Sequence, residues 1–145
     1  MKDLLYPKDE QIKEFIQLLY YAYRETFSDP KDILSKKFFG PAHLRALHLI
    51  ERNPGINLGE LIFKLKVTKQ SLNRILNDLV KFNIISFIKD ERDSRMKHVH
   101  LTKKGEEVFK EIFSSQKKRI YNALIKSSSL EVNNFKSVLK KIINE

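Results

Sequence analysis

Residues Leu61–Gly105 read LIFKLKVTKQSLNRILNDLVKFNIISFIKDERDSRMKHVHLTKKG, and this stretch decides the fold. Between Thr68 and Phe82 the apolar residues fall on one side of a helical wheel and the polar residues on the other. The apolar side consists of Leu72, Ile75, Leu76, Leu79 and Val80. A shorter segment with helical spacing, starting at Asn57 and including Leu61, precedes it across a turn of about three residues. The pattern predicts a helix-turn-helix.

The starts of both helices carry N-cap signals. Asn57 is followed three residues later by Glu60, which resembles a capping box, and Thr68 is a suitable cap for the second helix. After Asn83, the segments Ile84–Ile88 and Lys97–Leu101 have strand-like patterns and flank a charged loop. This arrangement predicts a two-stranded β-hairpin, or wing, beside the second helix.

The polar side of the second helix has the side chains that read base edges. Asn and Gln can form paired hydrogen bonds with adenine, Lys and Arg with guanine, and Thr and Ser can reach phosphates or bases. A solvated surface helix usually carries more Glu, whereas this one has a single acid, Asp78. We therefore expect it to enter a DNA groove, with contacts from Thr68, Lys69, Gln70, Ser71, Asn73, Arg74 and Asn77.

The loop of the wing adds candidate contacts. An arginine at the tip of a wing can enter a narrow minor groove, and Arg92 and Arg95 are placed for this. Asp93 is expected to orient a neighbouring arginine through a charge-assisted hydrogen bond. Lysines near the helix and wing would attract phosphates: Lys64, Lys66, Lys97, Lys103 and Lys104.

The distribution of charge agrees with a polyanionic partner. The chain has a net charge of +10, and residues 64–104 contribute 11 Lys or Arg against 4 Asp or Glu, a net +7. A charge run is ordinarily a solvated face, but here it coincides with the amide-rich helix and the predicted wing. Double-stranded DNA is the expected partner.

Length and composition limit the remaining possibilities. A chain of 145 residues suits one domain with one core. It has no cysteine, which excludes disulfides and thiolate zinc sites. The first ten residues lack the apolar core of a signal peptide and no segment is long and apolar enough to span a membrane, so we expect a cytoplasmic location and no membrane partner.

Helices are predicted on both sides of the central stretch. Apolar residues recur at helical spacing from Asp9 to about Phe27 and from Pro41 to Arg52. Thr102 is placed to cap a long helix to about Ser127, and Ser128 with Glu131 opens a last helix. The terminal helices have more apolar surface than one small core could cover. The predicted fold class is mainly α (α+β).

The central stretch resembles the winged helix-turn-helix of the MarR family of transcriptional regulators. The resemblance lies in Asp93-Ser94-Arg95, in Leu101-Thr102-Lys103-Lys104-Gly105, in the Arg74-Ile75-Leu76 and Leu79 pattern of the preceding helix, and in the order of elements. Two positions differ: Asn83 stands where the family often has Gly, and Ile62 where it often has Ala. Asn tolerates the left-handed backbone angles that Gly would adopt.

The resemblance implies a single MarR-like domain over residues 1–145. A winged helix-turn-helix would occupy about 41–104, and helices at about 9–28 and 103–144 would form a homodimer. Two symmetric helices would read a pseudo-palindromic operator. It also implies a regulator that acts by repression and whose release is triggered by a small aromatic ligand, with candidate cleft residues Tyr20, Tyr23, Phe39, His43 and His48. Taken singly, each of these residues is more typical of an ordinary core or interface than of a ligand site.

Other functions are less well supported. A winged-helix module for protein assembly, or a nonspecific architectural DNA binder, is the alternative, and preference for a palindromic over a random duplex would distinguish them. His98 and His100 share a strand face, but without cysteine or a nearby third histidine we expect no metal site. With no phosphate loop or nucleophile motif, we expect no cofactor and no enzymatic activity.

Overall fold

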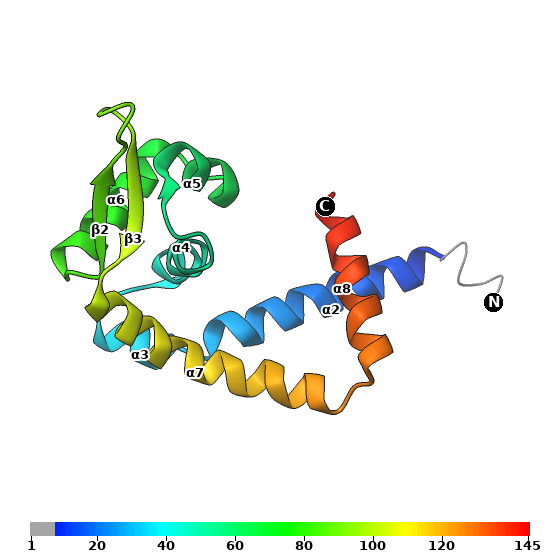
Figure 1. The fold of residues 1–145 in the computed structure, drawn as a ribbon. Coiled ribbons are helices and arrows are strands. Elements are labelled where there is room, and N and C mark those ends of the chain that lie inside the picture. The colour runs from blue at the N-terminus through cyan, green and yellow to red at the C-terminus, as the bar shows by residue number, and fades with distance from the viewer. Residues whose placement is uncertain (1–7) are drawn as a thin grey trace.

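Helices form most of the fold, and a small sheet lies at one end of it. The structure is a computed structural model that describes residues 8–145 (Figure 1). The elements are α2 (Asp9–Ser28), α3 (Lys31–Lys36), α4 (Pro41–Arg52), β1 (Ile56–Asn57), α5 (Leu58–Leu65), α6 (Lys69–Lys81), β2 (Ile85–Lys89), β3 (Lys97–Leu101), α7 (Lys103–Ile125) and α8 (Ser129–Ile142). The predicted mainly helical fold with a wing is confirmed.

Side-chain caps start the helices where the sequence predicts them. The Asn57 side chain accepts a hydrogen bond from the Glu60 N–H at 2.9 Å, and Thr68 Oγ1 accepts one from the Ser71 N–H at 3.0 Å. Thr102 Oγ1 accepts from the Gly105 N–H at 2.9 Å, and Ser128 forms a capping box. These bonds satisfy backbone donors that have no partner inside the helix.

The sheet has one more strand than predicted. Its order is β1-β3-β2, and both pairs are antiparallel, with Ile56 opposite Val99 and Phe87 opposite Val99 from the other side. The added strand β1 is two residues long, too short for an alternating pattern to be visible in the sequence. Its chain enters from Gly55, whose φ of +84° suits a glycine.

Two further local predictions are corrected by the structure. Val80, assigned to the apolar side of α6, is 44% exposed, because the buried stripe of that helix ends at Leu79. The segment Lys31–Lys36 forms the short helix α3 after Pro30, where no element was predicted from the sequence. Leu34 anchors this helix in the core.

The core lies between the sheet and helices α4, α5, α6 and the first half of α7. Its most deeply buried side chains are Leu44, Leu47, Ile50, Leu61, Leu72, Leu79, Ile84, Val99 and Ile112. Each buried leucine or isoleucine contributes roughly 1.5–3 kcal/mol by removal from water. The apolar side of α6 is thereby held inward, and its polar side is left outward.

The junction between wing and α7 explains the Leu-Thr-x-x-Gly motif. The Thr102 N–H donates to the Ile84 carbonyl at 2.9 Å, and the Thr102 hydroxyl donates to the Asn83 carbonyl at 2.6 Å. Gly105 lies so close to Ile84 that a Cβ there would contact the Ile84 carbonyl group. The motif therefore fixes the start of α7 against the base of the wing. Asn83 has φ +58°, the left-handed angle expected for this position.

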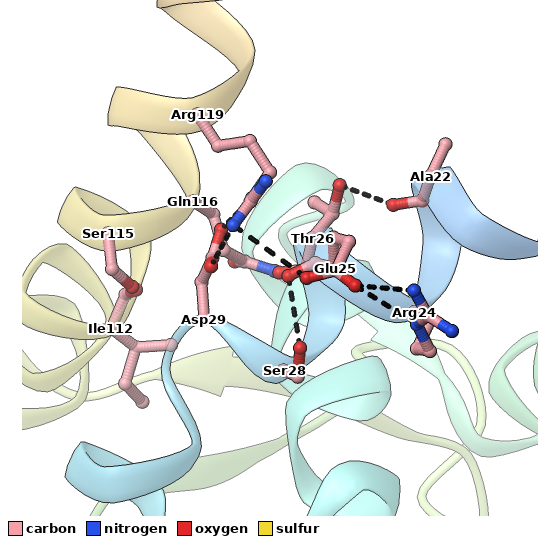
Figure 2. A network of polar contacts seen from close by, with 10 residues as sticks. All are labelled: Ala22, Arg24, Glu25, Thr26, Ser28, Asp29, Ile112, Ser115, Gln116 and Arg119. Atoms are coloured by element: carbon pink, nitrogen blue, oxygen red, sulfur yellow. Dashed lines mark hydrogen bonds and ion pairs between the residues drawn. The ribbon is translucent and has the colours of Figure 1, made fainter.

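Polar contacts tie α7 to the end of α2. Figure 2 shows Arg119 and Gln116 on α7 facing Asp29, Glu25 and Thr26. Arg119 donates two hydrogen bonds to the Asp29 carboxylate, at 2.6 and 2.9 Å, which raises the pKa of the Arg119 guanidinium. Gln116 is 3% exposed; it donates to the Thr26 carbonyl at 2.9 Å and accepts from His48 Nε2 at 2.7 Å. One buried amide thus joins α2, α4 and α7.

Helices α2, α8 and the end of α7 extend away from the winged part as an arm (Figure 1). Neither α2 nor α8 has a buried residue. Large apolar side chains are exposed along all three: Ile12, Phe15, Ile16, Leu18, Leu19, Ile120, Tyr121, Leu124, Ile125, Leu130, Phe135, Val138 and Ile142. No helix within residues 8–145 is long and apolar enough to cross a membrane.

Candidate nucleic-acid interface

The polar side of α6 is presented to solvent. Lys69, Gln70, Asn73, Arg74 and Asn77 are exposed, while their apolar neighbours are buried. Thr68 is also exposed and Ser71 half-buried, and both are engaged in the cap, with the Thr68 hydroxyl 2.9 Å from Ser71 Oγ. The turn before α6 passes through Lys66, whose φ of +52° gives the sharp change of direction between α5 and α6.

The single acid of α6, Asp78, is paired with a histidine of α4. His43 Nε2 lies 2.9 Å from Asp78 Oδ2, and His43 Nδ1 accepts a hydrogen bond from the Gly40 N–H at 3.0 Å. Because Nδ1 accepts, Nε2 is the ring nitrogen that donates to Asp78. The contact fixes α6 against α4, and it leaves amides, hydroxyls and cations on the face of α6 that points outward.

An aspartate at the start of the wing loop organises its backbone. Asp90 Oδ2 accepts hydrogen bonds from the N–H groups of Arg92 and Asp93, both at 2.9 Å. The Asp90 N–H donates to the Met96 carbonyl at 2.9 Å, which closes the loop across its base. Asparagine and aspartate commonly bond in this way to the backbone two or three residues ahead.

The two wing arginines project from this loop. Arg92 is exposed, and the Arg95 side chain is 91% exposed. Asp93 Oδ1 accepts from the Arg95 N–H at 3.0 Å and lies 3.3 Å from Arg95 Nε. Lys97, at the start of β3, is exposed with Nζ 5.7 Å from the centre of the Phe87 ring. The loop backbone is therefore well ordered by hydrogen bonds, and its cations are free to meet a partner.

A histidine below the loop holds it to the rest of the sheet. His98 Nε2 lies 2.9 Å from Asp90 Oδ1, and His98 Nδ1 lies 2.7 Å from the Gly55 carbonyl oxygen. These hydrogen bonds raise the pKa of His98, and the bond from His98 with the two backbone bonds lowers the pKa of Asp90. From the sequence, His98 was considered only as a metal ligand and Asp90 was not singled out. The spacing of Asp90 from Arg92 and Asp93 was the available signal for this turn.

The candidate ligand residues separate into two groups. Tyr20, Tyr23 and Phe39 line a cavity of about 400 Å³ between α2, α3 and the start of α4, together with Arg24 and Lys31. His43 does not line this cavity, and its ring is bound to Asp78 and Gly40. His48 also lies elsewhere, with its ring against Phe27 and Phe109 and its Nε2 bonded to Gln116.

A helix-turn-helix followed at once by a β-hairpin, with an exposed cationic and amide-rich second helix, defines a winged helix-turn-helix DNA-binding protein. The MarR family model matches residues 39–96, from just before α4 to the end of the wing loop. The chain is also 38% identical over 141 residues to the HTH-type transcriptional regulator PetP of Rhodobacter capsulatus, covering 97% of this chain and 85% of PetP. The chain belongs to the MarR family of DNA-binding transcriptional regulators, which confirms the resemblance, and the family is not one of enzymes.

Solved structures share the fold at lower sequence identity. A mutant of MepR from a multidrug-resistant S. aureus clinical isolate gives a TM-score of 0.77 at 17% identity, covering 90% of this chain and 95% of that chain. A second mutant of S. aureus MepR, solved bound to an oligodeoxyribonucleotide, gives a TM-score of 0.61 at 17% identity, covering 90% of this chain and 96% of that chain. NadR in complex with 4-hydroxyphenylacetate gives a TM-score of 0.75 at 21% identity, covering 86% of this chain and 88% of that chain.

Proposed function

We propose that this regulator binds a pseudo-palindromic operator as a homodimer, represses transcription from it, and is released by a small aromatic ligand. The observation that carries the proposal is the outward face of α6, which is rich in amides and cations and whose single acid, Asp78, is paired with His43. The MepR structure with an oligodeoxyribonucleotide supports it, since MepR shares this fold.

In the proposed complex α6 enters the major groove. Lys69, Gln70, Asn73, Arg74 and Asn77 would face base edges, and the exposed start of α6 at Thr68 and Ser71 would face a phosphate. Arg92 and Arg95 would reach the flanking minor groove or backbone, and Lys97 a phosphate. Asp93 would hold Arg95 through the contact that the wing loop already makes.

Selection of bound duplexes from a random pool tests this directly. We expect a two-fold related sequence, and tighter binding to it than to random DNA of equal length. Arg74→Ala and Arg95→Ala should each weaken operator binding by about 1–3 kcal/mol per contact without unfolding the protein. Lys126→Ala removes a positive charge at the far end of α7 and is the matched control. Equal affinity for operator and random duplex would instead indicate an architectural role.

The homodimer is inferred from the exposed apolar surface of the arm. Contiguous exposed apolar surface on this scale marks an interaction site. We propose that residues 9–28 and 103–144 form the dimer and that residues 41–104 form the DNA-reading part. Phe135→Asp, on the apolar side of α8, should give a monomer in sedimentation analysis. Asn133→Asp adds the same charge on the polar side of α8, beside Lys136 and Lys140, and should remain dimeric.

Repression follows from the size of such a complex. Two recognition helices one helical turn apart would cover the operator on one side of the duplex and block access of other proteins to it. Transcription in vitro from a promoter that contains the selected site should fall as the regulator is added. A rise in transcript would show activation.

The cavity between α2, α3 and α4 is the proposed effector site. Tyr20, Tyr23 and Phe39 offer aromatic walls, while Lys31 and Arg24, which is paired with Glu25, offer positive charge for a carboxylate. NadR was solved with 4-hydroxyphenylacetate, a molecule of that chemistry. A panel of aromatic carboxylates should raise the melting temperature and release the operator. Arg24→Gln should reduce the response to carboxylates more than the response to the matching amides.

A further inference from the structure

The ring of His98 lies between two oxygen atoms that can only accept hydrogen bonds. Nδ1 is 2.7 Å from the carbonyl oxygen of Gly55, and Nε2 is 2.9 Å from Oδ1 of Asp90. A neutral imidazole has one N–H and could satisfy only one of these acceptors. Both contacts are hydrogen bonds only when both nitrogens carry a hydrogen, that is, when His98 is an imidazolium cation.

His43 shows that a carboxylate beside a histidine does not by itself have this effect. Its Nε2 also faces a carboxylate, that of Asp78, but its Nδ1 accepts from the Gly40 N–H. One ring N–H, at Nε2, is therefore enough to satisfy both contacts of His43. The difference at His98 is the second acceptor, the Gly55 carbonyl.

The carboxylate that His98 holds is the one that shapes the wing loop. While Oδ1 of Asp90 binds the ring, Oδ2 accepts from the N–H groups of Arg92 and Asp93. Asp93 in turn accepts from the Arg95 N–H. At the other side of the ring, Gly55 leads into β1 and the cap of α5. The imidazolium thus joins the start of the helix-turn-helix to the backbone that bears both wing arginines.

We propose that His98 and Asp90 are positioning residues for DNA binding, which together form a proton-dependent latch that sets the wing arginines relative to the helix-turn-helix. The proposal rests on the proposed contact of the wing with DNA. Loss of one proton from His98 breaks its hydrogen bond either to the Gly55 carbonyl or to the Asp90 carboxylate, and the ring then no longer ties the wing loop to the start of β1. Neither residue needs to touch DNA.

The charges around His98 favour the cation. Asp90 faces it from the wing loop, Glu60 adds an attraction from α5, and its strand neighbours Asn57 and Ile88 are uncharged. His100 lies on the same strand face, with its ring near Gly55. The charged groups of α4 and α7 near β3, Glu51, Arg52, Glu106 and Lys110, line a separate cavity of about 800 Å³ with His100.

These surroundings fix the direction of the pH dependence. The pKa of His98 is raised above its ordinary value of about 6.5, with the hydrogen bond to Asp90 as the largest cause. A raised pKa means that the latch is complete at low pH and is lost as pH rises through that pKa. The pKa of Asp90 is lowered, so the carboxylate stays charged well below neutrality.

The test combines NMR with operator binding at constant ionic strength from about pH 5.5 to 9. In the free protein, His98 should titrate with a midpoint above 6.5, and the amide signals of Arg92 and Asp93 should follow the same curve. Operator affinity should fall about three- to tenfold across that midpoint. Asp90→Asn should move the midpoint down toward 6.5, His98→Gln should abolish this pH dependence, and the matched control His100→Gln should keep it.

A midpoint for His98 at or below 6.5, or a His98→Gln protein that keeps the wild-type pH profile, would overturn the latch. If instead the proposed contact between the wing arginines and DNA is wrong, the experiments give a different pattern of results. In that case the double variant Arg92→Ala with Arg95→Ala would bind the operator as tightly as the wild type, while the NMR titration of His98 and the two amides would be unchanged.

Discussion

Substitution of Gly105 by alanine should destabilise the protein by crowding the base of the wing. An added Cβ would lie 3.0 Å from the Ile84 carbonyl carbon, 3.3 Å from Ile84 Cγ2 and closer still to the Ile84 oxygen. Ordinary carbon contacts are about 3.5–4.0 Å, so the Ile84 backbone must move and carry its carbonyl oxygen, which is the nearest atom, by more than about 1 Å. That backbone is held by hydrogen bonds from the N–H and hydroxyl of Thr102, at 2.9 and 3.2 Å.

Overpacking of this kind costs about 1–3 kcal/mol, and the higher helix propensity of alanine returns at most about 1 kcal/mol. We expect a net loss of about 2 kcal/mol, which corresponds to a melting temperature about 4–8 °C lower for a chain of this size. Circular dichroism at a fixed protein concentration measures it.

Gly59→Ala is the matched control, since a Cβ there would meet only Asn57 Oδ1 at an ordinary 3.4 Å. It should be neutral or slightly stabilising. A Gly105→Ala protein that melts at or above the wild-type temperature would show that Ile84 can yield without cost, and the account of the Leu-Thr-x-x-Gly motif would be wrong.

Three more outcomes are expected. If the dimer neutralises about six to ten phosphates, log operator affinity should fall against log salt with a slope near −5 to −9, and a flat response would contradict the electrostatic contribution. Thr68→Ala removes the cap of α6 and should lower the free energy of unfolding by about 1 kcal/mol in denaturant titration, whereas Thr68→Ser should not. Gln116→Leu leaves the Thr26 carbonyl and His48 Nε2 without their partner and should cost about 1–3 kcal/mol; unchanged stability would mean that water replaces the amide.

The elements with local signals were predictable from the sequence. Asn57, Thr68, Thr102 and Ser128 each bind the backbone N–H three residues ahead, so each helix starts where its cap predicts. The apolar stripe of α6 was visible because its buried residues repeat at helical spacing. Strand β1 could not be predicted, because two residues are too few to show an alternating pattern. Its partner β3 also lies more than 40 residues later in the chain.

The contacts in the site between residues far apart in the chain also could not be predicted from the sequence. Nothing near His98 indicates that its ring meets Gly55, 43 positions earlier, so from the sequence the His-x-His strand was weighed only as a metal site, and none was expected. His43 was grouped with the cleft aromatics for its position in the chain, but Asp78, 35 positions later, binds its ring. The exposed arginines of the wing were predictable, whereas the residues that hold their backbone were not.

Helix α7 runs without interruption for 23 residues, from the base of the wing into the arm. At 1.5 Å per residue it is a rod of about 34 Å. Its first turn is fixed to the wing by Thr102, and its later turns are fixed to α2 by Gln116 and Arg119. A tilt of about 5° would therefore carry one end through about 3 Å relative to the other, close to the rise of one base pair. In the proposed dimer, a small change in the angle of the arm would therefore shift a recognition helix by about one base pair along its operator.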